Sequence, residues 1–426
     1  MRTVNLTIDR LAYGPAGVGR TGGKVVFVPG TVPGDEVEVV LDEEKKNYAT
    51  GHVLTLQRPS PQRRTPPCPY VPRCGGCPWQ HVAYAEQLRA KEDIVRAQMR
   101  RIGGISAPPI SPIIPSPQEW HYRHRIRLRV EENARLGFYQ ATSHELVEIE
   151  SCLIAGEDIN SALREARAWL PTLRTIVRRV ELITSEPEHG VVLVGNAEGG
   201  FQAEDEARCT DFLQAHPTIS GLMLFGRGWR KVWGDSRITL GLDNDGQTLG
   251  VSPGVFTQVN LAGNRTLIAT LLQVGKFQEE QRVIELYCGA GNLSIPIASR
   301  VKKLIGVEHD QVAIADARAN ATRAGLTNTR FVCASASAGV QDLLRNGVRS
   351  DVIVLDPPRA GAPEVIDAIS RLGAQKVLFV SCDPATLARD LRRLSTHGYH
   401  TQLIQPLDLF PHTYHVETIS LSVLTC

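Results

Sequence analysis

From residue 254 to residue 426, apolar stretches alternate with segments of helical pattern. The apolar stretches lie near 282–287, 303–308, 329–333, 351–355, 376–380, 402–407 and 417–424. Strands that alternate with helices form βαβ units and a mostly parallel sheet. We therefore predict a Rossmann-like α/β domain over 254–426.

Residues 1–58 have a different pattern, in which short strand-like stretches are separated by glycine and proline turns. This pattern predicts a small OB-like β-barrel. Prolines between residues 58 and 67 then break regular structure, so we expect a linker there.

The remaining residues, 59–253, are expected to form a central α+β domain. A helical pattern covers 84–101, and this helix can pack on the C-terminal domain. The strand-like stretch 120–130 carries arginines at every second position, so their side chains project from one face of the strand. These arginines are Arg123, Arg125, Arg127 and Arg129.

Charge is unevenly distributed along the chain. The net charge of the 426 residues is +2, but residues 61–135 carry thirteen Lys/Arg against six Asp/Glu, a net of +7. A local basic block indicates a surface that faces a polyanion such as RNA, although a solvated basic face would have the same composition. No apolar run is long enough for a membrane helix and the first residues have no apolar signal core, so we expect a cytoplasmic protein without membrane contact.

Three of the nine cysteines lie close together in one loop. Cys68, Cys74 and Cys77 are separated by five and two residues, and Cys152 follows at a distance. Disulfides are rare in the cytosol, so a metal or cluster site is the expected use of these thiols. Four thiolates can hold either zinc or a [4Fe–4S] cluster, and the spacing does not separate the two.

A glycine turn follows the first strand of the predicted sheet. Gly289 and Gly291 allow the backbone to approach a nucleotide ligand, and Glu308 ends the next strand at a spacing typical of an acid that binds ribose hydroxyls. The third glycine of dinucleotide sites is missing, so S-adenosylmethionine fits better than a dinucleotide. An α/β turn without a ligand is the alternative.

Asp356-Pro357-Pro358-Arg359 follows the fourth strand. Asp-Pro-Pro loops at this place occur in methyltransferases that act on nucleic-acid bases. Those that methylate amino groups usually carry an aromatic residue after the prolines, and Arg359 stands there instead. A turn that only caps the strand would also explain the two prolines.

Cys382 follows the fifth strand, at the edge where α/β sheets place catalytic groups. C5 of uracil is a poor nucleophile, but a thiolate that adds to C6 turns C5 into an enolate carbon able to attack a methyl sulfonium. A base must then remove the C5 proton. Glu417, at the start of the last strand, is our candidate for that base.

Taken together, these residues resemble the RNA (uracil-C5)-methyltransferase family, in its branch with an N-terminal TRAM barrel and an iron–sulfur cluster. The resemblance covers nearly the whole chain. It rests on Gly17–Arg20, Pro33–Asp35, the cysteine loop 68–81, Phe256–Asn260 and Ser381–Asp390. It implies a class I methyltransferase domain, and it implies [4Fe–4S] rather than zinc on Cys68, Cys74, Cys77 and Cys152.

The resemblance also assigns roles in the C-terminal domain. It implies that S-adenosylmethionine contacts Gln258, Tyr287, Gly289, Gly291, Asn292, Glu308, Ser335 and Asp356. Members often have Asn or Asp at the position of Ser335. Asp356 would lie between cofactor and uracil, Cys382 would be the nucleophile and Glu417 the general base. Phe256 and the four arginines would contact RNA.

The predicted function is therefore methylation of a uridine in structured RNA at C5 by a monomeric enzyme. The favoured substrate is 23S rRNA, and the tRNA T-loop is the alternative. A rival from another class is an RNA-binding assembly factor without catalysis, and a further rival is a methyltransferase for another base position. The presence of Cys382, Glu417, Asp356 and Gln258 argues against the assembly factor.

Overall fold

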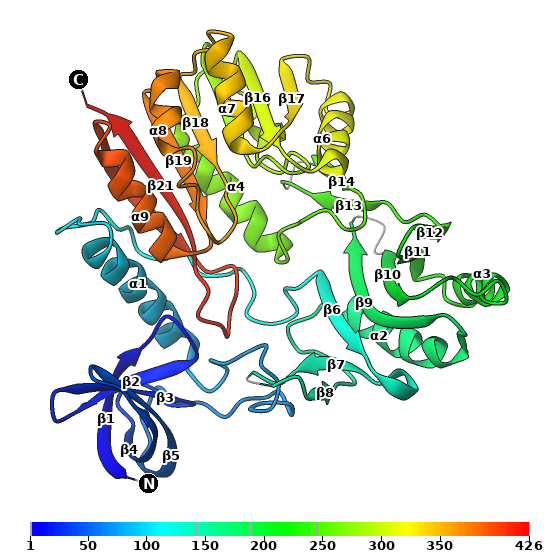
Figure 1. The fold of residues 1–426 in the computed structure, drawn as a ribbon. Coiled ribbons are helices and arrows are strands. Elements are labelled where there is room, and N and C mark those ends of the chain that lie inside the picture. Colours follow the sequence, from blue (N-terminus) through cyan, green and yellow to red (C-terminus); the bar gives the residue numbers. More distant parts are fainter. Residues whose placement is uncertain (1, 142, 187–189, 244–245, 426) are drawn as a thin grey trace.

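The computed structural model describes residues 2–141, 143–186, 190–243 and 246–425. Figure 1 shows an N-terminal barrel below a C-terminal α/β layer, with a second sheet beside both. Among the described residues, no helix is long and apolar enough to cross a membrane.

The barrel is closed by five strands in the order β1-β2-β3-β5-β4. Alternate residues of these strands, such as Leu6, Ile8, Val26 and Val28, point inward and form its core. The strands are β1 (Thr3–Leu11), β2 (Ala16–Thr21), β3 (Lys24–Pro29), β4 (Glu36–Glu44) and β5 (Tyr48–Arg58). The predicted N-terminal barrel is therefore present.

The central part is a seven-stranded sheet in the order β12-β11-β10-β9-β6-β7-β8. Helices α2 (Glu157–Trp169) and α3 (Asp205–Ala215) pack on it through a shared apolar core. Its strands are β6 (Arg125–Val130), β7 (Leu136–Tyr139), β8 (Leu146–Glu148), β9 (Ile176–Ser185), β10 (Gly190–Glu198), β11 (Ile219–Gly226) and β12 (Trp229–Gly234). A hairpin of β13 (Ile238–Gly241) and β14 (Thr248–Val251) connects it to the C-terminal part.

The C-terminal part is a second seven-stranded sheet, in the order β17-β16-β15-β18-β19-β21-β20. All neighbours pair in parallel except β21, which runs antiparallel to β19 and β20. The strands are β15 (Arg282–Leu286), β16 (Lys303–Glu308), β17 (Thr329–Cys333), β18 (Val352–Leu355), β19 (Lys376–Ser381), β20 (Tyr399–Leu407) and β21 (Glu417–Leu424). Each of these strands overlaps one of the seven predicted stretches.

Helices cover both faces of this sheet, which explains why its strands are nearly continuous apolar runs. They are α4 (Leu261–Gly275), α5 (Ser294–Ala298), α6 (Gln311–Arg323), α7 (Ala336–Arg345), α8 (Ile366–Ile369) and α9 (Pro384–Ser395). A predicted helix from the N-terminal half, α1 (Tyr84–Arg101), joins them. Val95 and Met99 of α1 belong to the same buried core as Leu387 and Leu391 of α9.

Candidate functional site

The predicted catalytic residues meet at one edge of the C-terminal sheet. In the sheet register, Leu286 of β15 lies beside Leu355 of β18, and Ser381 of β19 lies beside Thr418 of β21. Asp356 and Cys382 follow the carboxyl ends of β18 and β19. Because β21 runs in the opposite direction, its first residue, Glu417, reaches the same edge.

Cys382 lies in a rigid turn between β19 and α9. The Asp383 carboxylate caps α9, with Oδ1 accepting from the backbone N–H groups of Ala385 and Thr386, both at 2.9 Å. Asp383 as N-cap followed by Pro384 at the first helical position is a strong helix start, so the backbone beside the thiol is well defined. Burial and the nearby Glu417 raise the pKa of the half-buried Cys382 thiol to about 12, while the Arg359 guanidinium acts to lower it.

Two carboxyl groups lie near this thiol, the buried Glu417 and the partly buried Asp356. Glu417 is 1% exposed, and its Oε1 has no hydrogen-bond partner among the described residues. Burial, and then the neighbouring Asp356, raise the pKa of Glu417 well above its ordinary value. Burial also raises the pKa of Asp356 to about 7. Asp356 can therefore exchange a proton near neutral pH, whereas burial favours the protonated form of Glu417.

The glycine turn after β15 is held close to Glu308. Gly289 and Gly291 have φ angles of 53° and 96°, which favour glycine, and Tyr287 also has a positive φ of 63°. The Gly289 N–H donates to Glu308 Oε2 at 3.2 Å, and the N–H of His309 donates to Oε1 of the same carboxylate at 2.7 Å. The turn and the predicted ribose-binding acid therefore form one unit.

The other residues expected at the cofactor have different local roles. Asn292 exchanges two side-chain hydrogen bonds with Asn264, at 2.8 and 2.9 Å. The exposed Ser335 caps α7, accepting from the Ala338 N–H at 3.2 Å. Gln258 is 9% exposed and lies two residues before Asn260, whose side chain caps α4.

Sequence reasoning missed a further acid at this edge, the buried Glu285. Glu285 lies inside β15 and accepts a hydrogen bond from Ser294. Burial, despite that bond, raises its pKa to about 8, with Asp356 and Glu308 adding to the rise. An acidic residue inside an otherwise apolar strand was a signal that could have identified it.

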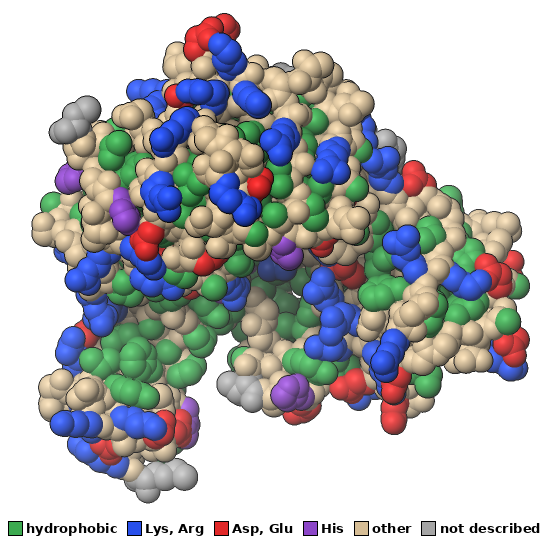
Figure 2. All heavy atoms as spheres, turned by 45° about the horizontal axis from the view of Figure 1, so that its top comes forward, with side chains coloured by type: hydrophobic (Ala, Val, Ile, Leu, Met, Phe, Trp, Pro, Cys, Tyr) green, Lys and Arg blue, Asp and Glu red, His purple; other side chains and the backbone are tan. Residues whose placement is uncertain are grey.

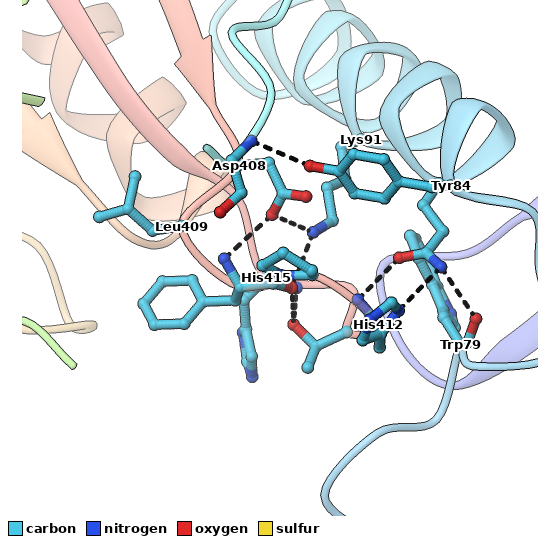
Figure 3. Close-up of polar contacts among 12 residues, drawn as sticks. Trp79, Tyr84, Lys91, Asp408, Leu409, His412 and His415 are labelled. Carbon is cyan, nitrogen blue, oxygen red and sulfur yellow. Dashed lines mark hydrogen bonds and ion pairs between the residues drawn. The ribbon is translucent and has the colours of Figure 1, made fainter. Parts of the chain in front are cut away.

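The loop between β20 and β21 carries the chain into Glu417, and N-terminal residues hold it (Figure 3). Lys91 of α1 donates to Asp408 Oδ1 at 2.6 Å and to the Phe410 carbonyl at 3.0 Å, and both side chains of this ion pair are 0% exposed. The His412 N–H donates to Gln87 Oε1 at 2.7 Å, and the Trp79 N–H donates to the His412 carbonyl at 2.9 Å. Asn260 adds a bond to the Leu409 carbonyl at 3.1 Å.

The predicted arginine face is only partly free for a ligand. Arg125 is 8% exposed, donates to Glu181 Oε1 at 2.6 Å and also bonds the Val255 carbonyl at 2.8 Å. The charge of Arg125 is therefore already paired within the protein, and its contact with RNA stays a prediction. Arg127 shares Glu181 but its side chain is 54% exposed, and Arg129 lies 5.0 Å over the Tyr139 ring.

Arg123 precedes β6 and faces two cavities. One, of about 310 Å³, is also lined by Arg127 and by Phe256, which is 73% exposed. The other, of about 260 Å³, is lined by all four predicted cysteine ligands, Cys68, Cys74, Cys77 and Cys152. The buried Nε of Arg123 has no hydrogen-bond partner among the described residues.

The four cysteines therefore share one cavity although Cys152 is distant in sequence. Burial is the main cause that raises the pKa values of Cys74, Cys77 and Cys152. Within the described part of the chain, no three His, Cys, Asp or Glu side chains come close enough to hold a single metal ion.

Comparison with known proteins decides the family. A sequence model described as tRNA (Uracil-5-)-methyltransferase matches residues 83–423, and one for the TRAM domain matches residues 1–54. The chain belongs to the tRNA (uracil-5-)-methyltransferase family. Members are RNA (uracil-5)-methyltransferases, so this protein is a transferase of that class.

Relatives of this uracil-5-methyltransferase match it along nearly its whole length. A protein named as an uncharacterized RNA methyltransferase from Thermosynechococcus vestitus is 38% identical over 98% of this chain and 97% of its own. The 23S rRNA (uracil(1939)-C(5))-methyltransferase RlmD of Pectobacterium atrosepticum is 35% identical over 98% of this chain and 93% of its own.

A solved structure has the same fold. The Pyrococcus abyssi tRNA (uracil-54, C5)-methyltransferase, in complex with S-adenosyl-L-homocysteine, superimposes with a TM-score of 0.76 at 24% identity, over 99% of this chain and 100% of that one. The fold is that of an S-adenosylmethionine-dependent methyltransferase with an N-terminal barrel, as predicted.

The buried ion pair between Lys91 and Asp408 predicts an effect on the stability of this uracil-5-methyltransferase. Lys91→Ala leaves Asp408 buried without its cation, which costs about 3–5 kcal/mol of unfolding free energy. We expect a clearly lower midpoint in urea denaturation. Lys45→Ala removes an exposed pair with Glu43 and should leave the midpoint nearly unchanged. Equal midpoints for the two variants would contradict a structural role for the buried pair.

Proposed function

We propose that this protein methylates C5 of a specific uridine in structured RNA, with 23S rRNA as the favoured substrate, through a covalent bond between Cys382 and C6 of the uracil. The observation that supports this most is the meeting of Cys382, Glu417 and Asp356 at one sheet edge. A nucleophile, a candidate base and a further carboxyl group are what the chemistry requires.

The same edge suits S-adenosylmethionine as the methyl donor. The glycine turn and Glu308 form the unit expected to hold the nucleoside, with Gln258, Tyr287 and Asn292 around it. Glu285, Asp356 and Glu417 all have raised pKa values, so a cation beside them would favour their ionised forms. When bound, S-adenosylmethionine supplies both the methyl group and that positive charge.

The chain's residues would act in three steps. The Cys382 thiolate adds to C6 of the uracil, and the electron pair displaced from the C5–C6 bond makes C5 nucleophilic. After C5 has taken the methyl group, Glu417 removes the C5 proton. The electrons of that C–H bond restore the C5–C6 double bond, and the thiolate leaves. Arg359, which acts to lower the pKa of Cys382, would favour the thiolate.

RNA access is supported by the shape and charge of the surface. Figure 2 shows a hollow between the barrel and the central sheet, beneath the catalytic part, with Lys and Arg side chains beside it. Arg127 and the exposed Phe256 line one cavity, and they combine a phosphate-binding charge with a ring that can stack on a base. A uridine must leave its stack to reach Cys382, which is easiest in an unpaired loop.

We favour a [4Fe–4S] cluster over zinc in the four-cysteine cavity, because the family branch that the sequence resembles carries such a cluster. All four cysteines line one cavity of about 260 Å³, and four thiolates are the ligand set of such a cluster. The unpaired Arg123 Nε would help to balance the negative charge that cluster and thiolates bring. Since methyl transfer moves no net electrons, the role of the cluster would be structural.

The covalent mechanism can be tested with RNA that carries 5-fluorouridine at the target. Fluorine cannot leave as a proton does, so wild type should accumulate an adduct that survives denaturing electrophoresis. Cys382→Ala should form none. Glu417→Gln should still form the adduct with fluorinated RNA but lose turnover of ordinary RNA by at least about 100-fold, the scale of general-base catalysis.

Two results would contradict these assignments. Adduct formation by Cys382→Ala would exclude this thiol as the nucleophile, and normal turnover by Glu417→Gln would exclude the base. Cys209→Ala, which removes a thiol of α3 away from the catalytic edge, is the matched control and should form the adduct like wild type.

The proposed [4Fe–4S] cluster implies a defined iron and sulfide content of the purified protein. Protein purified without oxygen should contain about four irons and four sulfides per chain, with the broad visible absorbance of a cluster. Cys77→Ser should lose most of the iron, while Cys333→Ser should keep it. One zinc per chain in place of iron, or full iron in Cys77→Ser, would refute the cluster assignment.

The RNA target can be found by mapping 5-methyluridine in rRNA and tRNA from cells with and without the gene. We expect one or two 23S rRNA positions to lose the modification, and a gene encoding wild type but not Cys382→Ala to restore it. Loss confined to the tRNA T-loop would select the alternative substrate. No change in either RNA would support a non-catalytic binding role.

A further inference from the structure

A tyrosine of the barrel reaches the residue next to the nucleophile. Tyr13 lies between β1 and β2, and its hydroxyl donates to Asp383 Oδ2 at 3.0 Å across 370 residues of sequence. Asp383 directly follows Cys382. The barrel therefore contacts the catalytic turn itself, beyond any contact it makes with RNA.

The contact is part of a packed interface between the barrel and residues of the other two parts. The Tyr13 ring meets the Tyr414 ring edge-on at 5.8 Å, and Tyr414 lies in the loop that leads to Glu417. Trp79, 0% exposed, donates from Nε1 to the Gly14 carbonyl at 3.1 Å and packs near Tyr414. Leu11 of β1 and Ile94 of α1 belong to the same apolar cluster. Several independent contacts thus fix the position of the Tyr13 hydroxyl.

The two oxygens of Asp383 are used in different ways. Oδ1 caps α9 and Oδ2 accepts from Tyr13, so the carboxylate is held from both sides. Its negative charge is one of three that raise the pKa of the Cys382 thiol, after those of Glu417 and Asp356, and Arg359 opposes them. A hydrogen bond to a carboxylate reduces the charge that its other neighbours experience.

Tyr13 is suited to remain a donor. Burial and Asp383 raise the pKa of its phenol, so the hydroxyl stays protonated throughout the pH range in which the enzyme would work. Arg359 acts to lower the pKa of this phenol. Its guanidinium also bonds the His415 ring, with Nη2 and Nε2 3.4 Å apart.

We propose that Tyr13 is a positioning residue for Cys382. Its hydroxyl orients Asp383 and reduces the negative charge that the carboxylate exerts on the thiol, so formation of the nucleophilic thiolate depends on the docked barrel. This inference rests on the proposed function of Cys382. It gives the barrel a part in building the active site.

The test is Tyr13→Phe in the full-length protein, which keeps the ring and its packing and removes the hydroxyl. The rate of adduct formation with 5-fluorouridine RNA is measured in single turnover from pH 6 to pH 9, together with the Kd for RNA. We expect a rate about 5- to 10-fold lower at pH 7, because only part of the free energy of the lost charge-assisted hydrogen bond acts on the neighbouring thiolate. The pH profile should shift upward, with a smaller deficit at pH 9, and the Kd should stay unchanged.

Two further variants separate this role from others. In an Asp383→Asn background, where Asn still caps α9 but carries no charge, Tyr13→Phe should change the rate and its pH profile much less. Tyr48→Phe, at an exposed ring of the same barrel, should behave like wild type.

Three outcomes would overturn the inference. An unshifted pH profile with a weaker Kd would make Tyr13 an RNA contact, and a lower Tm with an unchanged adduct rate would make it a docking residue only. An equal loss in the Asp383→Asn background would show that it does not act through Asp383. Absence of any adduct in wild type would instead refute the proposed function of Cys382. Failure of that proposal can therefore be told apart from failure of the Tyr13 inference.

Discussion

The antiparallel pairing of β21 with β19 is the constraint on which the site depends. Ser381 lies beside Thr418 because β21 enters the sheet against the direction of its neighbours. A parallel strand would have brought its carboxyl end to this edge and its first residue to the opposite one. The reversed strand therefore places Glu417 beside Cys382, with Asp356 one strand further along. Main-chain hydrogen bonds, which do not depend on side-chain identity, set this arrangement.

Burial gives these side chains their chemistry. Burial at an apolar sheet edge raises the pKa values of Glu285, Asp356 and Glu417, and the charge of Asp356 adds to the rise at Glu285 and at Glu417. Such a cluster is unfavourable for stability, and it is the type of arrangement that accumulates at functional sites. A ligand that brings positive charge would relieve it, which couples donor binding to the protonation state of the site.

Segments from the N-terminal half complete the catalytic part. Lys91 and Gln87 of α1, with Trp79 from the cysteine loop, hold the chain between β20 and β21. Trp79 lies two residues after Cys77, so order in the four-cysteine cavity and order in the loop before Glu417 are linked through a short stretch of backbone. The three parts thus form one connected structure, in which segments of the N-terminal half also support the catalytic edge.

Much of this could be predicted from local sequence. The seven C-terminal strands and helix 84–101 carry strong hydrophobic periodicity, and such signals depend only on neighbouring residues. Cys382 and Asp356 followed from their position at strand ends, and the cysteine loop followed from its spacing. The family model matches residues 83–423, which include Cys382 and Asp356 but not the cysteine loop.

Other features were decided only by the tertiary structure. The arginines at every second position predicted a shared face, but Glu181 of β9 forms a buried ion pair with Arg125. Neither Lys91–Asp408 nor Tyr13–Asp383 has a sequence signal, because the partners are more than 300 residues apart. Local patterns determine which elements form and which residues end them. Which charges are neutralised, and which groups remain free to react, depends on what the fold brings against each side chain.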